Sequence, residues 1–476
     1  MKELNDSITD MDKKITRREA IKGMFFAGVG LAASGSLLQS CASRNAKAAT
    51  ASDVKAIPWT EAPEGSKVDT KTWPKLGETL SRLGLGCMRL PALSGSSGGY
   101  GRRAPLDQEA VNEMVDYAIA HGVNYFDTAP AYGESEVVMG KALSRYPRES
   151  YKLATKMSNQ NGLPTLDAAK QMFETSLKNL QVDFFDFFLL HNVAGVDVFN
   201  RRFRDNGVFD YILEQKAAGR IKHLGFSFHG TNATLAPMLD LYDWDFVQIQ
   251  LNYADWKDMP AGFGAIEGDT SSEYLYNLLT ERGIPVLVME PIKGGALANV
   301  SDAIAGVLKE RHPDLTPAGN ALTFVGSLPN VLVTLSGMSN LEQLKENVST
   351  FTDFKPFDDK EMAFMQTVAD LYKSNIHIPC TGCSYCMPCP QGVNIPGNFR
   401  AFNTASDQLS IPDPDNRDRD KDYDKRKKTF LKLYDQLDKG EKASACITCN
   451  ACLSKCPQRI RIPEQLKMIS DLVAKL

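Results

Sequence analysis

The fold is indicated first by the segment Val123-Asn-Tyr-Phe-Asp-Thr-Ala-Pro-Ala-Tyr-Gly-Glu-Ser-Glu136, in which a short apolar run ends in a carboxylate, Asp127, and a turn follows. The same pattern returns at residues 151–156 and 184–191, where each apolar run again ends in a polar side chain. Short apolar runs bounded by turn residues are typical of buried strands. We therefore expect buried strands whose carboxyl ends carry polar groups.

Eight such strands alternate with amphipathic stretches between residues 75 and 350. Helical stretches such as residues 106–121, 166–180 and 275–282 lie between them, and each ends near a glycine or a polar turn. An open sheet rarely repeats this unit so regularly, so the alternation predicts an α/β protein with a (β/α)8 TIM barrel. The expected strands are residues 80–88, 123–127, 151–156, 184–191, 221–227, 246–250, 285–289 and 331–335.

Polar side chains stand at the carboxyl ends of four successive predicted strands. Asp127 closes the second strand, Lys156 the third, His191 the fourth and Ser227 the fifth, while Tyr132 lies in the loop after Asp127. The active sites of TIM barrels lie at this end of the barrel. We therefore expect these side chains to meet on one rim.

This combination suggests a reaction at a carbonyl group. A carbonyl that receives hydride develops negative charge on its oxygen and needs a proton donor, and Tyr132 can serve if the cation of Lys156 eases formation of its phenolate. Asp127 would orient Lys156, and His191 would bind the carbonyl oxygen. Taken singly, the residues also fit ordinary roles: Asp127 as a helix cap, His191 as a core histidine and Tyr132 as a surface aromatic.

Four segments in the same order resemble the signature segments of the aldo/keto reductase family: residues 124–136, Leu153-Ala-Thr-Lys156, Phe188-Leu-Leu-His191 and Ser336-Gly-Met-Ser-Asn-Leu-Glu-Gln-Leu-Lys-Glu-Asn347. The resemblance covers residues 75–350. It implies a (β/α)8 barrel that binds a nicotinamide cofactor across its rim. It further implies catalytic roles for Asp127, Tyr132, Lys156 and His191, with the tyrosine as general acid.

The resemblance also implies the residues around the nicotinamide. Ser227 and Gln248 match positions that hold its carboxamide, and Met289 falls where a stacking aromatic is expected. Gly86, Cys87 and Met88 end the first strand beside the nicotinamide. For Cys87 the alternatives are a reactive thiol and a small buried apolar residue, and we favour the second.

The adenine end of the cofactor is less clearly marked. Glu346 and Asn347 match the pair that meets the adenine, but Gly337 and Gln343 fall where cations commonly hold a 2′-phosphate. A 2′-phosphate carries nearly two charges, and without a cation its desolvation is poorly compensated. NADP and NAD therefore both remain open. Lys293 and Lys345 are candidate substitutes, each weighed against a solvated surface role.

Eight of the ten cysteines lie in two motifs in the last hundred residues. The second motif has the spacing C-x2-C-x2-C-x3-C-P of bacterial ferredoxins, and the first is one residue shorter before its last cysteine. Both resemble the ferredoxin-like domain found C-terminal to a branch of aldo/keto reductases. The predicted ligands are Cys380, Cys383, Cys386, Cys389, Cys446, Cys449, Cys452 and Cys456.

Two 4Fe-4S clusters are the expected count, each with three thiolates from one motif and the fourth from the other. The shorter first motif leaves a single cluster as the alternative. Zinc is a weaker interpretation, since zinc sites seldom repeat three evenly spaced cysteines followed by Cys-Pro. Structural disulfides are weaker still, because CxxC triplets serve them poorly.

The N-terminus carries an export pattern. Thr16-Arg17-Arg18-Glu19-Ala20-Ile21-Lys22 resembles a twin-arginine signal, and a glycine-rich apolar run, too short for a membrane span, follows it. Two cleavage points compete, a signal-peptidase site at 46–48 and a lipoprotein-like box ending at Cys41. We therefore expect an exported protein, either periplasmic or held at the membrane surface by a lipid on Cys41.

The expected organisation is a signal segment (residues 1–48), a tether (49–74), the barrel (75–350), a helical connector (351–376) and a 4Fe-4S ferredoxin-like domain (377–476). The formal charge of −4 lacks the basic excess that nucleic-acid binding requires. A hydrophobic content of 43% excludes a disordered chain. Nucleic acid is therefore not an expected partner.

The expected function is an oxidoreductase that transfers hydride between a nicotinamide cofactor and a small carbonyl or alcohol substrate. Nicotinamide delivers two electrons and each cluster takes one, and no flavin signature is visible to split the pair. The clusters therefore either serve a redox partner protein or are structural, and we favour the second. The alternatives are an iron-sulfur electron-transfer protein that uses the barrel as a docking platform, and a nucleotide-sensing barrel without turnover.

Overall fold

The structure is a computed structural model that describes residues 59–93, 105–158, 165–257, 270–373, 377–456, 458 and 460–476. These residues belong to one compact unit, Ile57–Leu476. The predicted twin-arginine segment, both cleavage points and Cys41 lie outside the described residues, as do residues 49–58 of the predicted tether.

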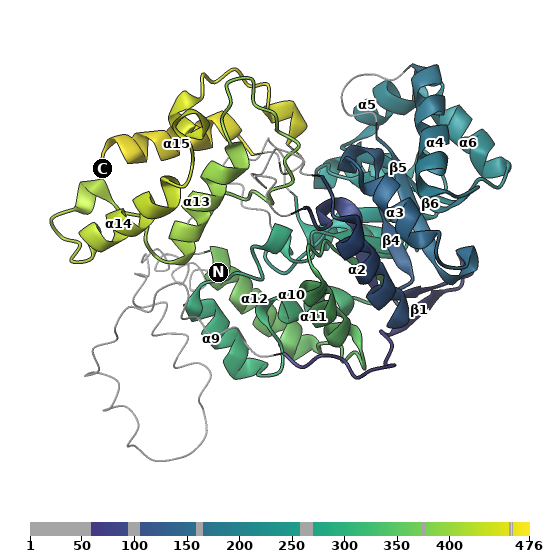
Figure 1. The fold of residues 1–476 in the computed structure, drawn as a ribbon, viewed down its shortest axis with the longest axis horizontal. Helices are drawn as coiled ribbons and strands as arrows, with labels where there is room; N and C mark the ends of the chain where they lie inside the picture. Colours follow the sequence, from purple (N-terminus) through teal and green to yellow (C-terminus); the bar gives the residue numbers. More distant parts are fainter. Residues whose placement is uncertain are drawn as a thin grey trace, which may run out of the picture. The chain divides into compact units, whose positions relative to one another are not determined.

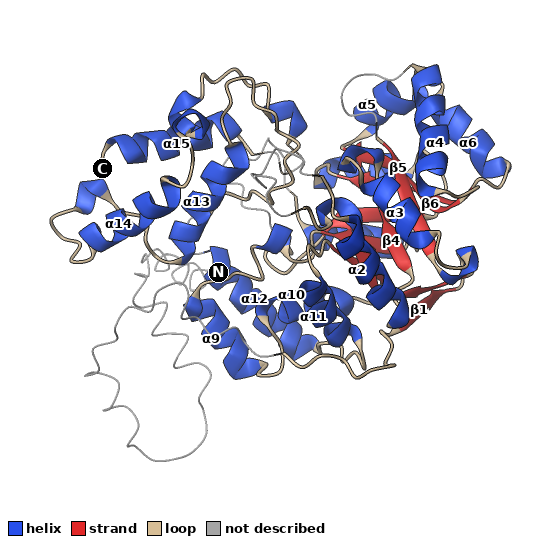
Figure 2. Cartoon of the chain, in the orientation of Figure 1, coloured by secondary structure: helices blue, strands red, loops and turns tan. Residues whose placement is uncertain are grey.

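Eight parallel strands close into a barrel in the order β10-β3-β4-β5-β6-β7-β8-β9, which confirms the predicted (β/α)8 fold. Figure 2 shows these strands enclosed by helices. The strands are rich in fully buried Phe, Leu and Val, as expected of strands covered on both faces. Their bounds are β3 (Leu83–Gly86), β4 (Tyr125–Asp127), β5 (Lys152–Met157), β6 (Phe185–Val193), β7 (Ile221–Phe228), β8 (Phe246–Gln250), β9 (Val286–Met289) and β10 (Val331–Ser336).

Helices cover the outside of the barrel, and several begin at a polar side chain that caps the first turn. The Asp107 carboxylate accepts from the backbone N–H groups of Glu109 and Ala110 at the start of α2, and the Thr165 hydroxyl caps α4. Helices such as α2 and α4 bury one apolar stripe, whereas α10 is buried along almost its whole length. The helices are α2 (Gln108–Ala120), α3 (Ser135–Leu143), α4 (Leu166–Leu180), α5 (Val196–Phe199), α6 (Val208–Ala217), α7 (Asn232–Leu239), α8 (Ser272–Glu281), α9 (Asp302–Arg311), α10 (Pro317–Gly326) and α11 (Leu341–Phe351).

A hairpin closes the floor of the barrel, and here the structure differs from the prediction. The predicted first strand, residues 80–88, is divided, because β2 (Glu78–Ser81) pairs antiparallel with β1 (Thr70–Trp73) before β3 begins. Leu80 packs in a buried cluster with Tyr125, Phe187 and Phe246, which stand in the first half of their strands. Burial of this side chain draws part of the expected tether into the fold and leaves the opposite rim open for chemistry.

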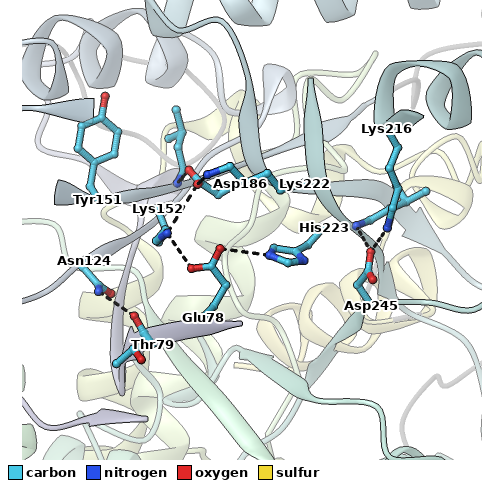
Figure 3. Close-up of polar contacts among 12 residues, drawn as sticks. Glu78, Thr79, Asn124, Tyr151, Lys152, Asp186, Lys216, Lys222, His223 and Asp245 are labelled. Atoms are coloured by element: carbon cyan, nitrogen blue, oxygen red, sulfur yellow. Dashed lines mark hydrogen bonds and ion pairs between the residues drawn. The ribbon is translucent and has the colours of Figure 1, made fainter. Parts of the chain in front are cut away.

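Charged residues surround the floor (Figure 3). Glu78 lies 2.7 Å from the Lys152 ammonium and 3.2 Å from Nε2 of His223, while the buried Asp186 accepts from Lys222 at 3.0 Å. Asp186 also accepts from the backbone N–H of Leu153 at 3.0 Å. A buried carboxylate needs such partners, so this network stabilises the end of the barrel that is remote from the predicted active site.

The C-terminal tail has a hydrophobic core of its own. Helix α12 (Asp359–Lys373) follows the barrel, and α13 (Ile395–Asp407), α14 (Tyr423–Tyr434) and α15 (Ile462–Ala474) lie together in Figure 1. Phe399, Phe430 and Leu466 are buried between these helices, and most cysteines of the two motifs pack against the same core. None of the helices in the described ranges is long and apolar enough to cross a membrane.

Candidate active site

A buried ion pair occupies the rim. Asp127 ends β4 and Lys156 lies on the neighbouring β5, with exposed fractions of 4% and 1%. The Lys156 ammonium donates to the Asp127 carboxylate and, at 2.8 Å, to the carbonyl oxygen of Thr128. The side-chain amide of Gln248 donates to the other carboxylate oxygen of Asp127 at 3.2 Å. Each buried charge thus has a charged or polar partner, as its burial requires.

Tyr132 lies beside this pair, in the 3-10 helix Pro130–Tyr132 that follows β4. The Lys156 ammonium is 5.2 Å from the centre of the Tyr132 ring, and the His191 ring meets Tyr132 edge-on at a centroid distance of 5.8 Å. The structure therefore brings together all four predicted catalytic residues, Asp127, Tyr132, Lys156 and His191.

The titration of Tyr132 differs from the expectation. Burial, followed by the electrostatic effects of Tyr385 and Asp127, raises the pKa of Tyr132 well above its ordinary value. The expected easing of phenolate formation by Lys156 is thus outweighed, because burial is the largest cause of the raised pKa. Tyr132 keeps its proton and can act as a donor.

His191 is held neutral and oriented. Burial, followed by the charge of Lys156, lowers the pKa of His191 well below its ordinary value. Its Nδ1 atom lies 2.6 Å from the hydroxyl of Ser158. When this hydroxyl donates to Nδ1, the ring carries its proton on Nε2 and presents a donor to the site. Arg202 fixes the end of β6 by donating to the carbonyl oxygens of His191 and Asn192 at 2.8 and 2.6 Å.

Three contacts of this site were missed in the sequence: Ser158, Arg202 and Tyr385. Ser158 follows Lys156 by two residues at the same strand end, so the strand pattern could have found it. Arg202 lies in the π-helical segment Asn200–Arg204, which no sequence pattern marks. Tyr385 lies 194 positions after His191, within the first cysteine motif, and its hydroxyl is 3.4 Å from His191 Nε2.

The predicted nicotinamide residues lie around the same rim. Ser227 and Gln248 are paired directly across β7 and β8 and are almost fully buried. Gly86 pairs with Asp127 across β3 and β4, and Met289 ends β9. Ser227 accepts from the Asn192 N–H at 2.8 Å. Cys87 and Met88 lie in the 3-10 helix Cys87–Arg89.

Cys87 is 1% exposed. Burial raises the pKa of its thiol well above the ordinary value. An inaccessible, protonated thiol is a poor nucleophile, which supports the interpretation of Cys87 as a small buried residue rather than a reactive one.

The adenine-side positions lie on β10, α11 and the turn between them. Gln343 accepts from the backbone N–H of Ser339 at 2.8 Å, and Asn347 donates to the Ser336 hydroxyl at 2.9 Å. Glu346 accepts from the hydroxyl of Thr316. A Cβ atom on Gly337 would lie 3.3 Å from Cδ of Arg89, so an arginine from another strand end passes beside this position.

Both lysines considered as phosphate ligands are engaged elsewhere. Lys293 is buried and forms an ion pair of 2.6 Å with Asp255, and Lys345 lies 2.9 Å from Glu61. Either lysine would have to break its ion pair before its ammonium group could bind a 2′-phosphate.

The eight motif cysteines interact in two sets that cross the motifs. Cys456 of the second motif acts electrostatically on Cys380, Cys383 and Cys386 of the first. Cys389 of the first motif acts on Cys452, as do Cys446 and Cys449. Cys452 also acts on Cys386, so the two sets adjoin. Three thiols from one motif and one from the other is the arrangement of two-cluster ferredoxins.

The surroundings of these thiols fit iron-sulfur clusters. None of the nine described cysteines forms a disulfide. Burial raises the pKa of Cys380 and Cys383 to about 12, so a positively charged metal group is needed to hold their sulfurs as thiolates. A cavity among the second set has apolar as well as cysteine walls. It is lined by Cys386, Cys389, Cys446, Cys449, Cys452, Ile395, Ile447, Pro463 and Leu466, among others.

The spacing of the two motifs also separates a cluster from zinc, since zinc sites seldom repeat three evenly spaced cysteines followed by Cys-Pro. A four-iron cluster spans more space than one zinc ion, whose sulfur ligands lie about 2.3 Å from the metal. The donor set of four thiols in each group therefore favours the cluster.

Comparison with known proteins identifies the barrel. Residues 82–370 match the model of the aldo/keto reductase family. The chain belongs to the aldo/keto reductase family. Residues 379–460 of this reductase match a second model, the 4Fe-4S dicluster domain.

Named relatives agree with this membership. The chain is 26% identical over 298 residues to probable aldo-keto reductase 1 of Glycine max, covering 57% of this chain and 81% of the relative. It is 25% identical over 315 residues to the NADH-specific methylglyoxal reductase of Escherichia coli (strain K12), covering 57% and 90%. The solved holo structure of aldo-keto reductase AKR11C1 from Bacillus halodurans superposes with a TM-score of 0.50 at 22% identity, covering 63% of this chain and 96% of that one.

The family, the fold and the tail together establish the general activity. This aldo/keto reductase is an NAD(P)-dependent oxidoreductase with an appended iron-sulfur domain.

Proposed function

We propose that Tyr132, His191, Lys156 and Asp127 carry out carbonyl reduction and the reverse alcohol oxidation at the rim of the barrel. The observation that carries the proposal is the meeting of a protonated tyrosine and a neutral histidine beside a buried Lys–Asp pair. A proton donor and a neutral hydrogen-bond donor are the two groups that a carbonyl oxygen needs as it gains negative charge.

Each residue has one role in the reaction. His191 donates from Nε2 to the carbonyl oxygen and orients it, provided that Ser158 donates to Nδ1. A bound nicotinamide supplies the hydride for the carbonyl carbon. The oxygen takes the proton of Tyr132 and becomes the alcohol hydroxyl. The resulting phenolate is stabilised by the Lys156 ammonium until solvent returns the proton, and Asp127 keeps that ammonium in place.

We also propose a preference for NADH over NADPH. Gly337 and Gln343 supply no cation for a 2′-phosphate, and Lys293 and Lys345 are committed to Asp255 and Glu61. The 25% identical Escherichia coli relative is named as specific for NADH, which supports the same choice. Arg89 is the cation that could reverse it, and NADPH affinity that falls in Arg89→Met would count against the preference.

Turnover of a carbonyl panel tests the main proposal. The purified protein is incubated with NADH or NADPH and with methylglyoxal, simple aldehydes and hydroxyaldehydes, and oxidation of the cofactor is followed by its absorbance. We expect NADH-dependent reduction by wild type and none above background by Tyr132→Phe. Tight cofactor binding without turnover of any carbonyl would overturn the proposal.

We propose two 4Fe-4S clusters, one held by Cys380, Cys383, Cys386 and Cys456 and the other by Cys389, Cys446, Cys449 and Cys452. The crossing of the motifs in the two interacting sets supports this count. Iron analysis and paramagnetic resonance of the reduced protein are expected to give about eight irons per chain and two interacting signals. About four irons would indicate the single-cluster alternative.

One observation favours a second function, electron exchange with a redox partner protein. Cys449 is exposed, and Ile447, two positions before it, is an exposed large apolar side chain. A cluster beside such a surface is accessible to another protein. Cluster reduction by NADH would support a link to the barrel, whereas clusters that stay oxidised with NADH but are reduced by dithionite would support a separate or structural role.

We propose export by the twin-arginine route on the pattern Thr16-Arg17-Arg18-Glu19-Ala20-Ile21-Lys22. The product would be periplasmic, or lipid-anchored if Cys41 is modified. This route carries folded proteins, which suits a protein that acquires metal clusters before export. Replacement of Arg17 and Arg18 together by lysine is expected to leave the protein in the cytoplasmic fraction, and unchanged fractionation would overturn the proposal.

A further inference from the structure

Tyr385, from the first cysteine motif, lies in the active site of the barrel. Its hydroxyl is 3.4 Å from Nε2 of His191, and its ring meets the His191 ring at a centroid distance of 6.3 Å and an angle of 73°. A side-chain hydrogen bond also joins Tyr385 to Tyr132. The one hydroxyl thus meets both groups that the proposed mechanism assigns to the carbonyl oxygen.

Two further contacts hold this part of the tail against the barrel. Arg89, which follows β3, donates to the carbonyl oxygen of Thr381. Gly294, in the turn after β9, approaches the backbone of Thr381 so closely that a Cβ atom there would lie 2.3 Å from the same oxygen. Thr381 and Tyr385 are separated by only four positions. Tyr385 is therefore held in the active site by a docked segment of the tail, and not by the contacts of its own side chain alone.

The position of the hydroxyl has a consequence for substrates. A carbonyl oxygen that binds Tyr132 and His191 must take the place of the Tyr385 hydroxyl at both partners. The displaced hydroxyl remains next to the carbonyl, in a site where an unpaired polar group is costly. A substrate oxygen on the carbon adjacent to the carbonyl offers it a new partner. A plain alkyl group offers none.

We propose that Tyr385 is a specificity-determining residue that selects carbonyl compounds with an oxygen on the adjacent carbon, such as α-hydroxyaldehydes and α-dicarbonyls. This inference rests on the carbonyl site proposed above. It makes the iron-sulfur tail part of the substrate site, because Tyr385 lies between two of the predicted ligands, Cys383 and Cys386. The enzyme would discriminate between substrates because an α-oxygenated carbonyl compound gives the displaced Tyr385 hydroxyl a partner, whereas a plain alkyl compound leaves it unpaired.

Matched substrates and matched amides test the proposal. The pair 2-hydroxypropanal and propanal differs only in the α-hydroxyl and reports on turnover. The pair 2-hydroxypropanamide and propanamide cannot be reduced and reports on binding to the complex of the holoprotein with the oxidised cofactor, measured by calorimetry. We expect wild type to prefer the hydroxylated member of each pair roughly tenfold.

Tyr385→Phe removes the hydroxyl and keeps the ring. In this variant we expect both preferences to fall close to one, through weaker use of the hydroxylated member and equal or better use of the plain one. Tyr385→His, which retains a donor, should keep part of the preference. Tyr423→Phe is the matched control, since its ring is buried in the tail away from the site, and it should behave as wild type. Equal iron contents would show that the variants retain the clusters.

The outcomes separate the two proposals. If wild type binds 2-hydroxypropanamide more tightly than propanamide, Tyr385→Phe loses this preference and neither aldehyde is turned over, the role of Tyr385 is supported and the proposed reduction is overturned. Turnover with an unchanged preference in Tyr385→Phe would overturn the role of Tyr385 alone. An equal change for both members of a pair would also overturn it, because the hydroxyl would then block the site without selecting.

Discussion

The Lys156 ammonium and the Asp127 carboxylate form an ion pair that is almost wholly buried at the centre of the rim. The pair is extended by Gln248 on the carboxylate and by the carbonyl oxygen of Thr128 on the ammonium. It lies under Tyr132 and supplies a fixed charge arrangement before any substrate arrives. Such preorganised charge costs little reorganisation during reaction, which is the main way in which active sites stabilise developing charge.

Removal of one partner of this pair should destabilise the protein strongly. Lys156→Met leaves the Asp127 carboxylate buried and unpaired, and we expect a loss of about 3 kcal/mol in the free energy of unfolding, measured by urea denaturation. Lys75→Met is the control, since its pair with Asp243 is exposed and should be worth less than about 1 kcal/mol. The double variant Lys156→Met with Asp127→Asn should recover part of the loss. Equal stabilities for Lys156→Met and Lys75→Met would contradict the buried pair.

Tyr132→Phe should remove proton donation without removing cofactor binding. We expect kcat to fall about 100-fold or more, since general acid catalysis contributes that much in typical enzymes. Cofactor affinity, followed by quenching of protein fluorescence, should stay within a factor of about two, because it depends on residues other than the proton donor. A near-normal kcat in Tyr132→Phe would show that another group donates the proton.

Ser158 should act through His191. Ser158→Ala deletes the hydroxyl at 2.6 Å from Nδ1, so the neutral ring can place its proton on either nitrogen. We expect roughly tenfold lower kcat/KM with little change in stability, because general acid and orienting groups act only in the correct protonation state. Nitrogen NMR of labelled histidine should show a change of tautomer at His191. Ser144→Ala, on an exposed turn, is the control. An unaltered His191 spectrum would rule the positioning role out.

Acidic pH should destabilise the fold through His191. The pKa of this residue is lowered in the folded state, so the unfolded chain binds more protons as pH falls below the ordinary histidine value. Above the ordinary histidine pKa the ring is neutral in both the folded and the unfolded chain, so its burial carries no pH-dependent penalty. As pH falls from that pKa towards the lowered pKa of the folded state, the free energy of unfolding decreases progressively. The melting temperature of His191→Gln should fall less steeply than that of wild type below about pH 6.5. Parallel curves would show that His191 is not held neutral by burial.

Pairs of cysteine substitutions should reveal which thiols share a cluster. Cys456→Ser alone is expected to lower the iron content to about half, and adding Cys386→Ser should lower it little further, because both thiols serve one cluster. Cys456→Ser with Cys389→Ser should remove nearly all the iron. Cys87→Ser, in the barrel, is the control and should retain all of it. Loss of all iron in Cys456→Ser with Cys386→Ser would contradict the crossed assignment.

Local patterns were sufficient to predict the barrel and its four rim residues. Buried strands produce short apolar runs, and the end of each run marks the rim where Asp127, Lys156 and His191 stand. Cysteine spacing likewise marked both motifs, because ligands of one cluster must lie close in sequence to supply three thiolates from one loop. The floor hairpin was missed and the first strand was wrongly predicted as continuous over residues 80–88, since the burial of Leu80 against other strands leaves no local signal that β2 ends before β3.

Most of the strands, the residue types expected to be catalytic and both cysteine motifs could be predicted from the sequence, because these depend on neighbours within a few positions. The position of Tyr385 beside Tyr132 and His191 had no signal in the sequence and follows from the tertiary packing alone. The raised pKa of Tyr132 likewise comes from packing, through burial and through the neighbouring Tyr385 and Asp127. These relationships join residues far apart in the chain, and both the distances and the degree of burial that set them arise only when the barrel and tail pack.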